Sequence, residues 1–206
     1  AITGWGDASA ISTTSGTEAR IWSMDNFGED LIACPRDGAL FYWDKSAGLS
    51  ARAVAISSRA GADATTPTIA KQVLVSDRDR HIIAFGCDPE NNIGVQDPLL
   101  IRFSSQADPT QWLPSTTNTA DFRRISGGTE IVTAIQTRQE TLIFTDASLH
   151  TMQFVGPPFI FSINQISGQT TIMGPNAAIA VDGTVFWMGK ENFYMYAGQV
   201  QKMPCV

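Results

Sequence analysis

Apolar positions along the chain form four pairs of short runs, and a polar break separates the two runs of each pair. The runs are residues 31–34 and 39–43, 81–86 and 99–103, 141–145 and 149–154, and 184–189 and 193–197. They are rich in aromatic and β-branched side chains, which favour strands. The pattern therefore predicts four β-hairpins that recur at a loose period of roughly 40–60 residues.

Turn signals and flanking strands extend these hairpins into larger units. Pro35 sets the entry of the first turn, and Gly38 is expected to take its left-handed position. Further strands are expected at 72–76 and 82–85, around a charged turn at 77–80, and ahead of the last two hairpins at 130–136 and 177–181. Segments such as 159–165 and 200–203 supply a fourth strand per unit, and the long connection 45–66 carries one strand.

Successive antiparallel strands make a meander, and four unequal meanders favour one architecture. The hairpins follow one another too irregularly for a tight solenoid, whereas propeller blades tolerate loops of different lengths. We therefore predict an all-β fold of β-propeller-like antiparallel meander blades. A β-sandwich or barrel of short strands is the alternative.

Composition divides the chain into two parts. Residues 1–18 are rich in Gly, Ser, Thr and Ala and are expected to form an arm or linker, whereas residues 19–206 form the propeller-like domain. Four blades leave a propeller ring open, so closure needs more chain, a partner chain or a split terminal blade. The sequence is accordingly expected to be an excerpt of a longer polypeptide.

Charge and hydropathy exclude two classes of interaction. The 206 residues are 43% hydrophobic and 17% charged, which is enough for a sizeable core. The net charge of -6 leaves no broad basic face on which the phosphates of duplex DNA could be neutralised. No apolar stretch approaches the roughly 18 residues of a membrane span, so we expect no membrane insertion.

The residue types that commonly carry catalysis are few and scattered. Cys34, Cys87 and Cys205 are odd in number and far apart, which predicts reduced, buried thiols and neither a disulfide framework nor a zinc site. His81 and His150 fall within strand patterns and are interpreted as ordinary strand residues. The sequence also lacks the GxSxG, HExxH and P-loop motifs. We predict no enzymatic activity, no cofactor and no metal.

Three further patterns have both a functional and a structural interpretation. A glycoside hydrolase would need two paired carboxylates, and loop solvation equally explains the six candidates: Asp25, Glu29, Asp30, Asp44, Asp97 and Asp146. Residues 88–94 place oxygen ligands at alternate positions, as calcium loops do, but Gly94 falls one position late for an EF-hand. Arg123-Arg124 is isolated and is interpreted as a solvated or interface pair rather than as a nucleic-acid stacking site, and Arg102-Phe103 is expected to lie in a strand.

Four segments of the chain carry a family resemblance: residues 21–33 (IWSMDNFGEDLIA), 108–112 (DPTQW), 153–158 (QFVGPP) and 174–178 (GPNAA). They resemble the propeller-bearing part of the nozzle (tail tubular B type) proteins of short-tailed bacteriophages and related tail components. The similarity covers residues 19–205, nearly the whole chain. Nozzle proteins are much longer than this chain, so the part that forms the narrow tube lies outside the sequence.

The resemblance implies a structural, non-enzymatic role in the virion, and it carries over no catalytic residues. The chain would form part of a ring of copies, a hexamer, around the DNA-ejection channel, with adjacent tail or adaptor proteins as partners and DNA as passing cargo. An acidic wall would repel the phosphates of that DNA rather than hold them. The first alternative is a host glycan or receptor binding module, which exposure of Trp5 or Trp112 would favour, and the second is a propeller glycoside hydrolase.

Overall fold

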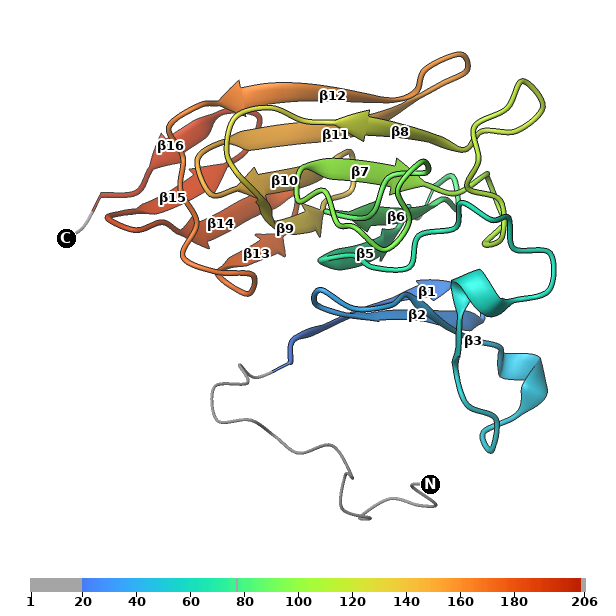
Figure 1. The fold of residues 1–206 in the computed structure, drawn as a ribbon. Coiled ribbons are helices and arrows are strands. Elements are labelled where there is room, and N and C mark those ends of the chain that lie inside the picture. The colour runs from blue at the N-terminus through green and yellow to red at the C-terminus, as the bar shows by residue number, and fades with distance from the viewer. Residues whose placement is uncertain (1–19, 77, 205–206) are drawn as a thin grey trace.

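The computed structural model describes residues 20–76 and 78–204, and the strands in them form four separate sheets. Each sheet contains four strands that are consecutive in the chain and pair antiparallel (Figure 1). We call these sheets blades 1 to 4, in chain order. The protein is therefore all-β with β-propeller-like meander blades, as the sequence predicted.

The strand bounds follow the predicted hairpins closely. Blade 1 consists of β1 (Trp22–Phe27), β2 (Asp30–Pro35), β3 (Phe41–Trp43) and β4 (Val54–Ala55). Blade 2 consists of β5 (Gln72–Val75), β6 (Ile82–Phe85), β7 (Leu100–Phe103) and β8 (Asp121–Arg124). Blade 3 consists of β9 (Ile131–Gln136), β10 (Thr141–Thr145), β11 (Leu149–Gly156) and β12 (Ile160–Ser167). Blade 4 consists of β13 (Ala178–Val181), β14 (Thr184–Met188), β15 (Phe193–Tyr196) and β16 (Val200–Lys202).

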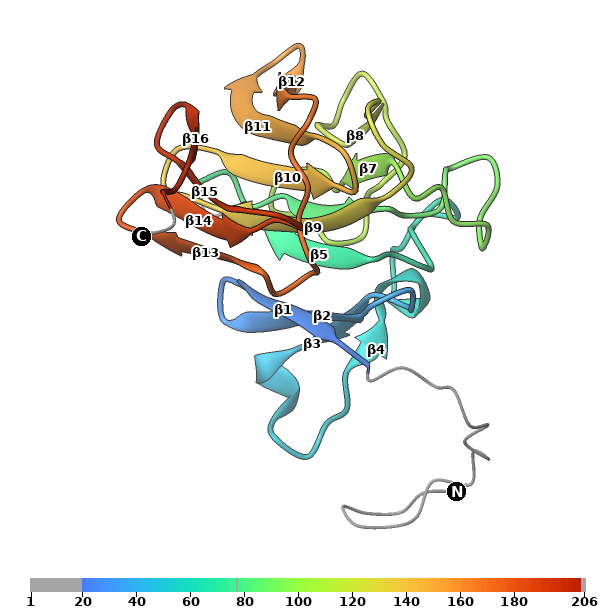
Figure 2. The ribbon, with the colours of Figure 1, turned by 90° about the vertical axis from the view of Figure 1, so that its left-hand side faces the viewer.

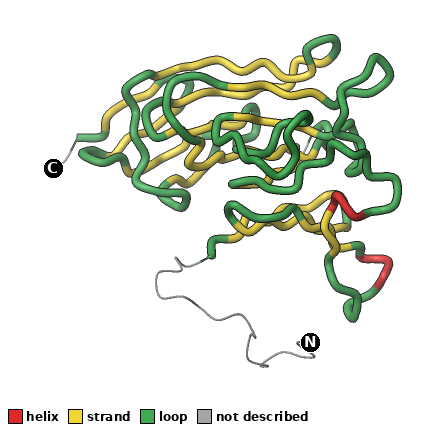
Figure 3. Tube along the Cα trace, viewed as in Figure 1, coloured by secondary structure: helices red, strands yellow, loops and turns green. Residues whose placement is uncertain are grey.

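The long connection after β3 carries one strand, β4, and the helical structure of the described residues. Figure 3 shows two short helical turns (red) beside blade 1, and these are the 3-10 helices η1 (Lys45–Ala47) and η2 (Ile56–Ser58). Asp44 caps η1 by accepting a hydrogen bond from the Ser46 backbone at 2.8 Å. No helix in the described part of the chain is long and apolar enough to cross a membrane.

The first strand of each blade is the innermost one. In Figure 2 the blades fan out from β1, β5, β9 and β13, and the later strands of each blade lie farther from the centre. Strand β1 packs against β5, and β9 packs against both β5 and β13. The four inner strands therefore line a shared centre, and each blade stands beside the next one in chain order.

Apolar cores fill the spaces between successive blades. The core between blades 1 and 2 includes Ile32, Cys34, Tyr42, Val73 and Ile82. The core between blades 2 and 3 includes Phe85, Ile101, Phe103, Ile143 and Met152, and the core between blades 3 and 4 includes Leu142, Phe144, Val185, Trp187 and Tyr196. Alternate side chains of a strand enter different cores, since successive residues point to opposite faces of a sheet.

Two local predictions differ from the structure. In the first hairpin turn, Asp37 adopts the left-handed conformation (φ 55°), and Gly38 does not. Gly38 is needed for space instead, because a Cβ there would lie 2.8 Å from Cγ of Pro35. The sequence pattern does not predict strand β8, because its residues alternate between half-buried and exposed and two of them are arginines. The predicted arm 1–18, Asp77 of the charged turn and Cys205 lie outside the described residues.

Candidate interaction surfaces

The inner strands of blades 1 and 2 are joined by side-chain hydrogen bonds to the backbone. Ser23 Oγ accepts a hydrogen bond from the Val73 backbone N–H at 3.0 Å. Asp25 Oδ2 accepts one from the Val75 N–H at 2.8 Å. These two β1 side chains occupy the inward edge of β5, so the angle between the two blades is set at the centre of the molecule.

The inner strands of blades 2 and 3 are joined in a similar way. The side-chain amide of Gln72 donates to the carbonyl oxygen of Ala134 at 2.7 Å and accepts from its N–H at 2.7 Å. Gln72 Oε1 also accepts from the Thr133 hydroxyl at 3.1 Å. Arg36, from the turn between β2 and β3, reaches across to the Val132 carbonyl oxygen at 2.8 Å. Polar side chains at the centre thus hold blades 1 to 3 as one unit.

Blade 4 has an apolar face directed away from blade 3, which we call the trailing face. It consists of Ile179, Val181, Phe186, Met188, Phe193 and Met195. Along β13, β14 and β15 these residues alternate with the residues that enter the core between blades 3 and 4, so they point to the opposite face of the sheet. Phe186 pairs with Met195, and Met188 with Phe193. The Phe193 side chain is 52% exposed. In the described structure this face has no covering element.

The equivalent pairs in the preceding blades are buried. On their second and third strands these are Ile83 with Phe103 and Phe85 with Ile101 in blade 2, and Phe144 with Leu149 in blade 3. All six side chains are almost completely buried, because the following blade covers them. The trailing face is therefore the same kind of packing surface, left uncovered.

Blade 1 has a matching apolar face directed away from blade 2, which we call the leading face. It consists of Trp22, Met24, Leu31, Phe41 and Trp43. On β2 and β3 the alternate residues Ile32 and Tyr42 enter the core with blade 2, and Trp22 and Met24 also line a pocket at the centre of the molecule. The rings of Trp22 and Phe41 lie 6.3 Å apart and form its aromatic part. Met24 is 59% exposed. Within residues 20–76 and 78–204, blades 1 and 4 thus each have an apolar sheet surface that no other blade covers.

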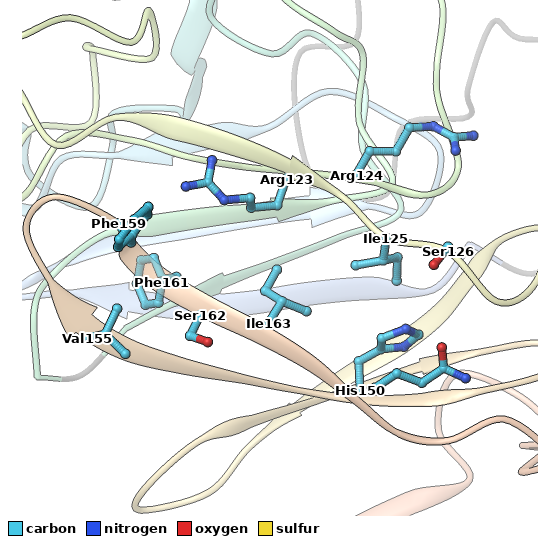
Figure 4. Close-up of a pocket in the computed structure, with 11 residues that line it drawn as sticks. Arg123, Arg124, Ile125, Ser126, His150, Val155, Phe159, Phe161, Ser162 and Ile163 are labelled. Atoms are coloured by element: carbon cyan, nitrogen blue, oxygen red, sulfur yellow. The ribbon is translucent and has the colours of Figure 1, made fainter.

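A groove of about 590 Å³ lies at the outer rim, between β8 of blade 2 and the β11–β12 hairpin of blade 3. Figure 4 shows Arg123 and Arg124 on the β8 side and Phe159, Phe161 and Ser162 on the hairpin side. The Phe159 ring is 65% exposed at the groove's edge. β8 and the β11–β12 hairpin are separated in the sequence by the strands β9 and β10, so the sequence pattern does not indicate the groove.

Intramolecular partners partly neutralise the two arginines of this rim groove. Arg124 Nε donates to Asp97 Oδ2 at 2.7 Å, and Arg123 Nη1 lies 2.5 Å from Asp121 Oδ2. His150 also lines the groove and is buried, and its Nδ1 has no hydrogen-bond partner. Burial lowers the pKa of His150, so the imidazole is neutral at pH 7. The groove is consequently apolar at its base and only weakly basic.

The six carboxylates considered for catalysis are all engaged in local structural interactions. Asp25 bonds to β5 as described above, and Asp44 caps η1. Asp30 accepts hydrogen bonds from the Tyr42 hydroxyl and the Lys45 N–H, and Glu29 pairs with Lys45 Nζ at 2.6 Å. Asp97 accepts from the Leu99 N–H and Arg124, and Asp146 accepts from the backbone and hydroxyl of Thr129. Asp25 therefore joins two blades, and the other five carboxylates lie in turns, loops or at strand ends.

The loop considered for calcium is organised around a buried aspartate. Asp88 is completely buried, and its carboxylate accepts hydrogen bonds from the Thr68 N–H, the Thr68 hydroxyl and the Gly94 N–H, at 2.6–3.1 Å. These donors occupy the lone pairs that a cation would need. In residues 20–76 and 78–204, no cluster of three or more His, Cys, Asp or Glu side chains is arranged to hold a metal ion.

The two cysteines in the described part of the chain are buried free thiols, as predicted. Cys34 lies in the core between blades 1 and 2, and burial raises its pKa to about 12. Burial likewise raises the pKa of Cys87 far above its ordinary value. Neither thiol is therefore a nucleophile at neutral pH.

His81 is a buried core residue rather than a ligand. Its Nε2 lies 3.1 Å from the Thr119 hydroxyl, and its ring contacts Phe103 and Phe161 at centroid distances of 6.1 and 5.3 Å. Nδ1 has no partner. Burial lowers its pKa, although the charge of Asp79 acts in the opposite direction. The interpretation as an ordinary strand residue agrees with this environment.

Arg102 lies in strand β7, as the sequence predicted, and its side chain is buried. Arg102 is 1% exposed, and its guanidinium donates to the Asp88 carbonyl at 3.2 Å and to the Trp112 carbonyl at 3.3 Å. Trp112 is also completely buried, as its position at the exit of the 108–112 turn predicted, and its indole N–H bonds to the Pro109 carbonyl. It is not an exposed platform for a ligand, and Trp5 lies outside the described residues.

Comparison with known proteins gives no family assignment. No family model matches the chain, and no curated protein sequence matches it. Among solved structures, the chain is similar to "KlHsv2 with loop 6CD replaced by a Gly-Ser linker", with 10% sequence identity and a TM-score of 0.49. The match covers 88% of this chain and 49% of that one, so this chain spans about half the length of that structure.

Proposed function

We propose that the protein is a structural subunit of a bacteriophage tail, of the nozzle type, and forms part of a ring around the DNA-ejection channel. The observation that carries the proposal is the pair of apolar faces, trailing and leading, at the two ends of the blade series. Surfaces of this kind on a folded protein mark contacts with other protein. The chain is accordingly built to be one part of a larger assembly.

The assignment to a tail rests on the sequence resemblance described above. Its segments fall at structurally defined places: residues 21–33 span β1, its turn and much of β2, and residues 174–178 lead into β13. Both segments contribute residues to one central pocket, among them Trp22, Met24, Pro175 and Asn176. The partners follow from the same resemblance: further copies of this chain, six in a ring, and adjacent tail or adaptor proteins in the virion.

Electrostatics supports a channel role in which DNA passes without being held. The chain carries a net charge of -6, and in the described residues the arginines of the rim groove are paired with aspartates. Repulsion between an acidic wall and DNA phosphates would keep the DNA mobile during ejection. If residues mapped to the channel wall were mainly basic, this part of the proposal would fail.

The test is a cryo-electron microscopy map of purified virions or of the oligomer isolated from them. We expect copies of the four-bladed unit arranged around the tail axis, with protein density on both end faces. A map in which the unit is a separate appendage, away from the axis and with uncovered end faces, would contradict the proposal.

A second candidate function, binding of a host glycan or receptor, is favoured by the rim groove. An exposed aromatic ring beside polar side chains is a common way to bind a sugar, and Phe159 lies beside Ser162 and Gln165 in this groove. Glycan-array binding that Phe159→Ala reduces by about tenfold or more would support this function. Binding that is unchanged in this variant would place the glycan site elsewhere or exclude it.

A further inference from the structure

We propose that the rim groove binds a sugar that carries a carboxylate, a hexuronic acid residue of an acidic polysaccharide, and that Arg123 selects the carboxylate. This inference rests on the second candidate function above, glycan binding at the rim groove, and names the class of glycan. Both walls of the groove belong to blades 2 and 3, which pack against each other through a shared core. The groove is therefore independent of what covers the end faces.

The strand register directs the Arg123 side chain toward the groove. On β8, Arg123 pairs with Ile101, which enters the core between blades 2 and 3. Arg124 pairs with Leu100, which enters the core between blades 1 and 2, so the two arginine side chains leave opposite faces of the sheet. In Figure 4 the Arg123 guanidinium lies toward the end of the groove that holds Phe159, and the Arg124 guanidinium is directed away from that end. Arg123 is therefore the cation that a ligand in the groove meets.

Arg123 retains hydrogen-bond donors for such a ligand. Its Nη1 lies 2.5 Å from Asp121 Oδ2 and donates to the Phe122 carbonyl oxygen at 2.7 Å. Within residues 20–76 and 78–204 its Nε and Nη2 have no hydrogen-bond partner, and the side chain is 36% exposed. No Asp or Glu side chain of this part of the chain lines the groove. Since a guanidinium binds a carboxylate through two parallel N–H groups, the free Nε–Nη2 edge fits a carboxylate.

The remaining lining residues match a sugar ring. Phe159 is 65% exposed and offers a flat apolar surface to the C–H groups of a pyranose. Ser162 and Gln165 supply hydroxyl and amide groups for the sugar hydroxyls. At the base, His150 is 3% exposed and its Nδ1 has no partner among the described residues, so a sugar hydroxyl that reaches this nitrogen satisfies a buried polar atom. The groove volume of about 590 Å³ also lies within the range of ligand sites.

The experiment measures binding by isothermal titration calorimetry. The probes are trisaccharides of glucuronate, galacturonate and mannuronate, each compared with its own methyl ester. The ester keeps the ring and its hydroxyls but carries no charge, so the ratio of the two dissociation constants isolates the contribution of the carboxylate.

Three arginine variants test which residue is responsible. Arg123→Gln removes the charge, and Arg123→Lys keeps the charge but loses the two parallel donors. Arg52→Gln is the matched control, because Arg52 is exposed and lies outside the groove. Circular dichroism and thermal unfolding confirm that each variant is folded.

We expect at least one of the three acids to bind about tenfold or more tightly than its ester. Arg123→Gln should remove this preference, Arg123→Lys should retain part of it, and Arg52→Gln should leave it unchanged. Phe159→Ala should weaken the binding of acid and ester by the same factor, because the ring contacts the face of the sugar that both share.

Three results would overturn the inference. Equal affinity for acid and ester would do so while leaving glycan binding standing. A preference for the acid that Arg123→Gln retains would show that another residue selects the carboxylate. The third is that none of the trisaccharides binds at millimolar concentration. In that case, glycan-array binding that Phe159→Ala reduces would still support the second candidate function, whereas an array without such binding would remove both. The tail assignment depends on none of these results, because the cryo-electron microscopy map tests it separately.

Discussion

The side chain of Gln72 on β5 hydrogen-bonds to the backbone of Ala134 on β9 in both directions, with both distances 2.7 Å. A primary amide carries the same donor and acceptor as a peptide group, so Gln72 satisfies Ala134 as a neighbouring strand would. Blades 2 and 3 are separate sheets, and this side chain connects their inner strands without merging them. Ser23 and Asp25 perform the corresponding task between blades 1 and 2.

Replacement of Gln72 by alanine should destabilise the protein by about 1–3 kcal/mol, because it leaves the partly buried N–H and carbonyl of Ala134 without partners. Gln72→Glu retains the acceptor for the Ala134 N–H but loses the donor to its carbonyl, so its loss should be similar or larger. Urea unfolding measures both. Gln199→Ala, at an exposed position, is the control and should change stability by less than about 0.5 kcal/mol. Equal stability of Gln72→Ala and the control would show that the inner strands are held by apolar packing alone.

Asp88→Asn should destabilise the protein by about 1–3 kcal/mol, because an amide cannot accept from all three donors that Asp88 now satisfies. The same arrangement predicts that millimolar calcium, or its removal with EDTA, leaves the melting temperature of the wild type unchanged. Differential scanning calorimetry tests both statements. A calcium-dependent rise in melting temperature that Asp88→Asn abolishes would restore the calcium interpretation of the 88–94 loop.

Cys34 and Cys87 should resist thiol reagents while the protein is folded. Burial excludes the reagent, and a pKa raised to about 12 at Cys34, and raised further at Cys87, leaves negligible thiolate at pH 8. With Cys205 replaced by serine, we expect less than about a tenth of a thiol per chain to react with DTNB under native conditions and both thiols to react in guanidinium chloride. Rapid labelling of either cysteine in the folded protein would contradict its buried position.

His81 should make stability fall as the pH decreases from about 7.5 to 5. Its folded pKa is lowered by burial, so the unfolded chain, with a histidine pKa of about 6.5, binds the proton more readily. The stability contributed by neutral His81 is present above about pH 6.5 and is lost as the pH falls toward the folded pKa, by at most about 1.4 kcal/mol per pH unit.

His81→Phe removes this titration while keeping an aromatic ring among Phe103 and Phe161. Urea unfolding at several pH values should give a shallower slope for the variant than for the wild type. His150, whose pKa is also lowered, accounts for part of the slope that remains. Identical slopes for variant and wild type would mean that His81 is equally protonated in the folded and unfolded states.

The strands that are apolar on at least one face could be predicted from sequence, and with them the four units. Strand β8 could not, because Asp121–Arg124 is an outer edge strand whose polar and charged side chains give no apolar pattern. The burial of Arg102 could not be predicted either. Its guanidinium bonds to the carbonyl oxygens of Asp88, in the loop before β7, and of Trp112, in the loop after it. Burial of charged side chains depends on contacts that a local pattern does not encode.

The end faces did leave a signal in the sequence. Strand β14 (TVFWM) is apolar on both faces, which is typical of a strand covered on both sides. The apolar residues on both faces of β14 therefore indicate that a further layer of protein covers Phe186 and Met188. The rim groove left no comparable signal, because it depends on the juxtaposition of β8 with Phe159, and only the packing of blade 2 against blade 3 creates it.

The pairing of each strand only with its neighbours in the chain has a consequence for the order in which the protein folds. Every ladder joins strands that are consecutive in the chain, and even the longest connection covers only residues 104–120, whereas the side-chain bonds between inner strands link residues 50 and 62 positions apart. Local pairing is entropically cheaper, so each blade should form as a unit before the blades dock. Unfolding should follow the same units, and amide hydrogen exchange should be slowest in blades 2 and 3, which are covered on both faces, and fastest in blades 1 and 4.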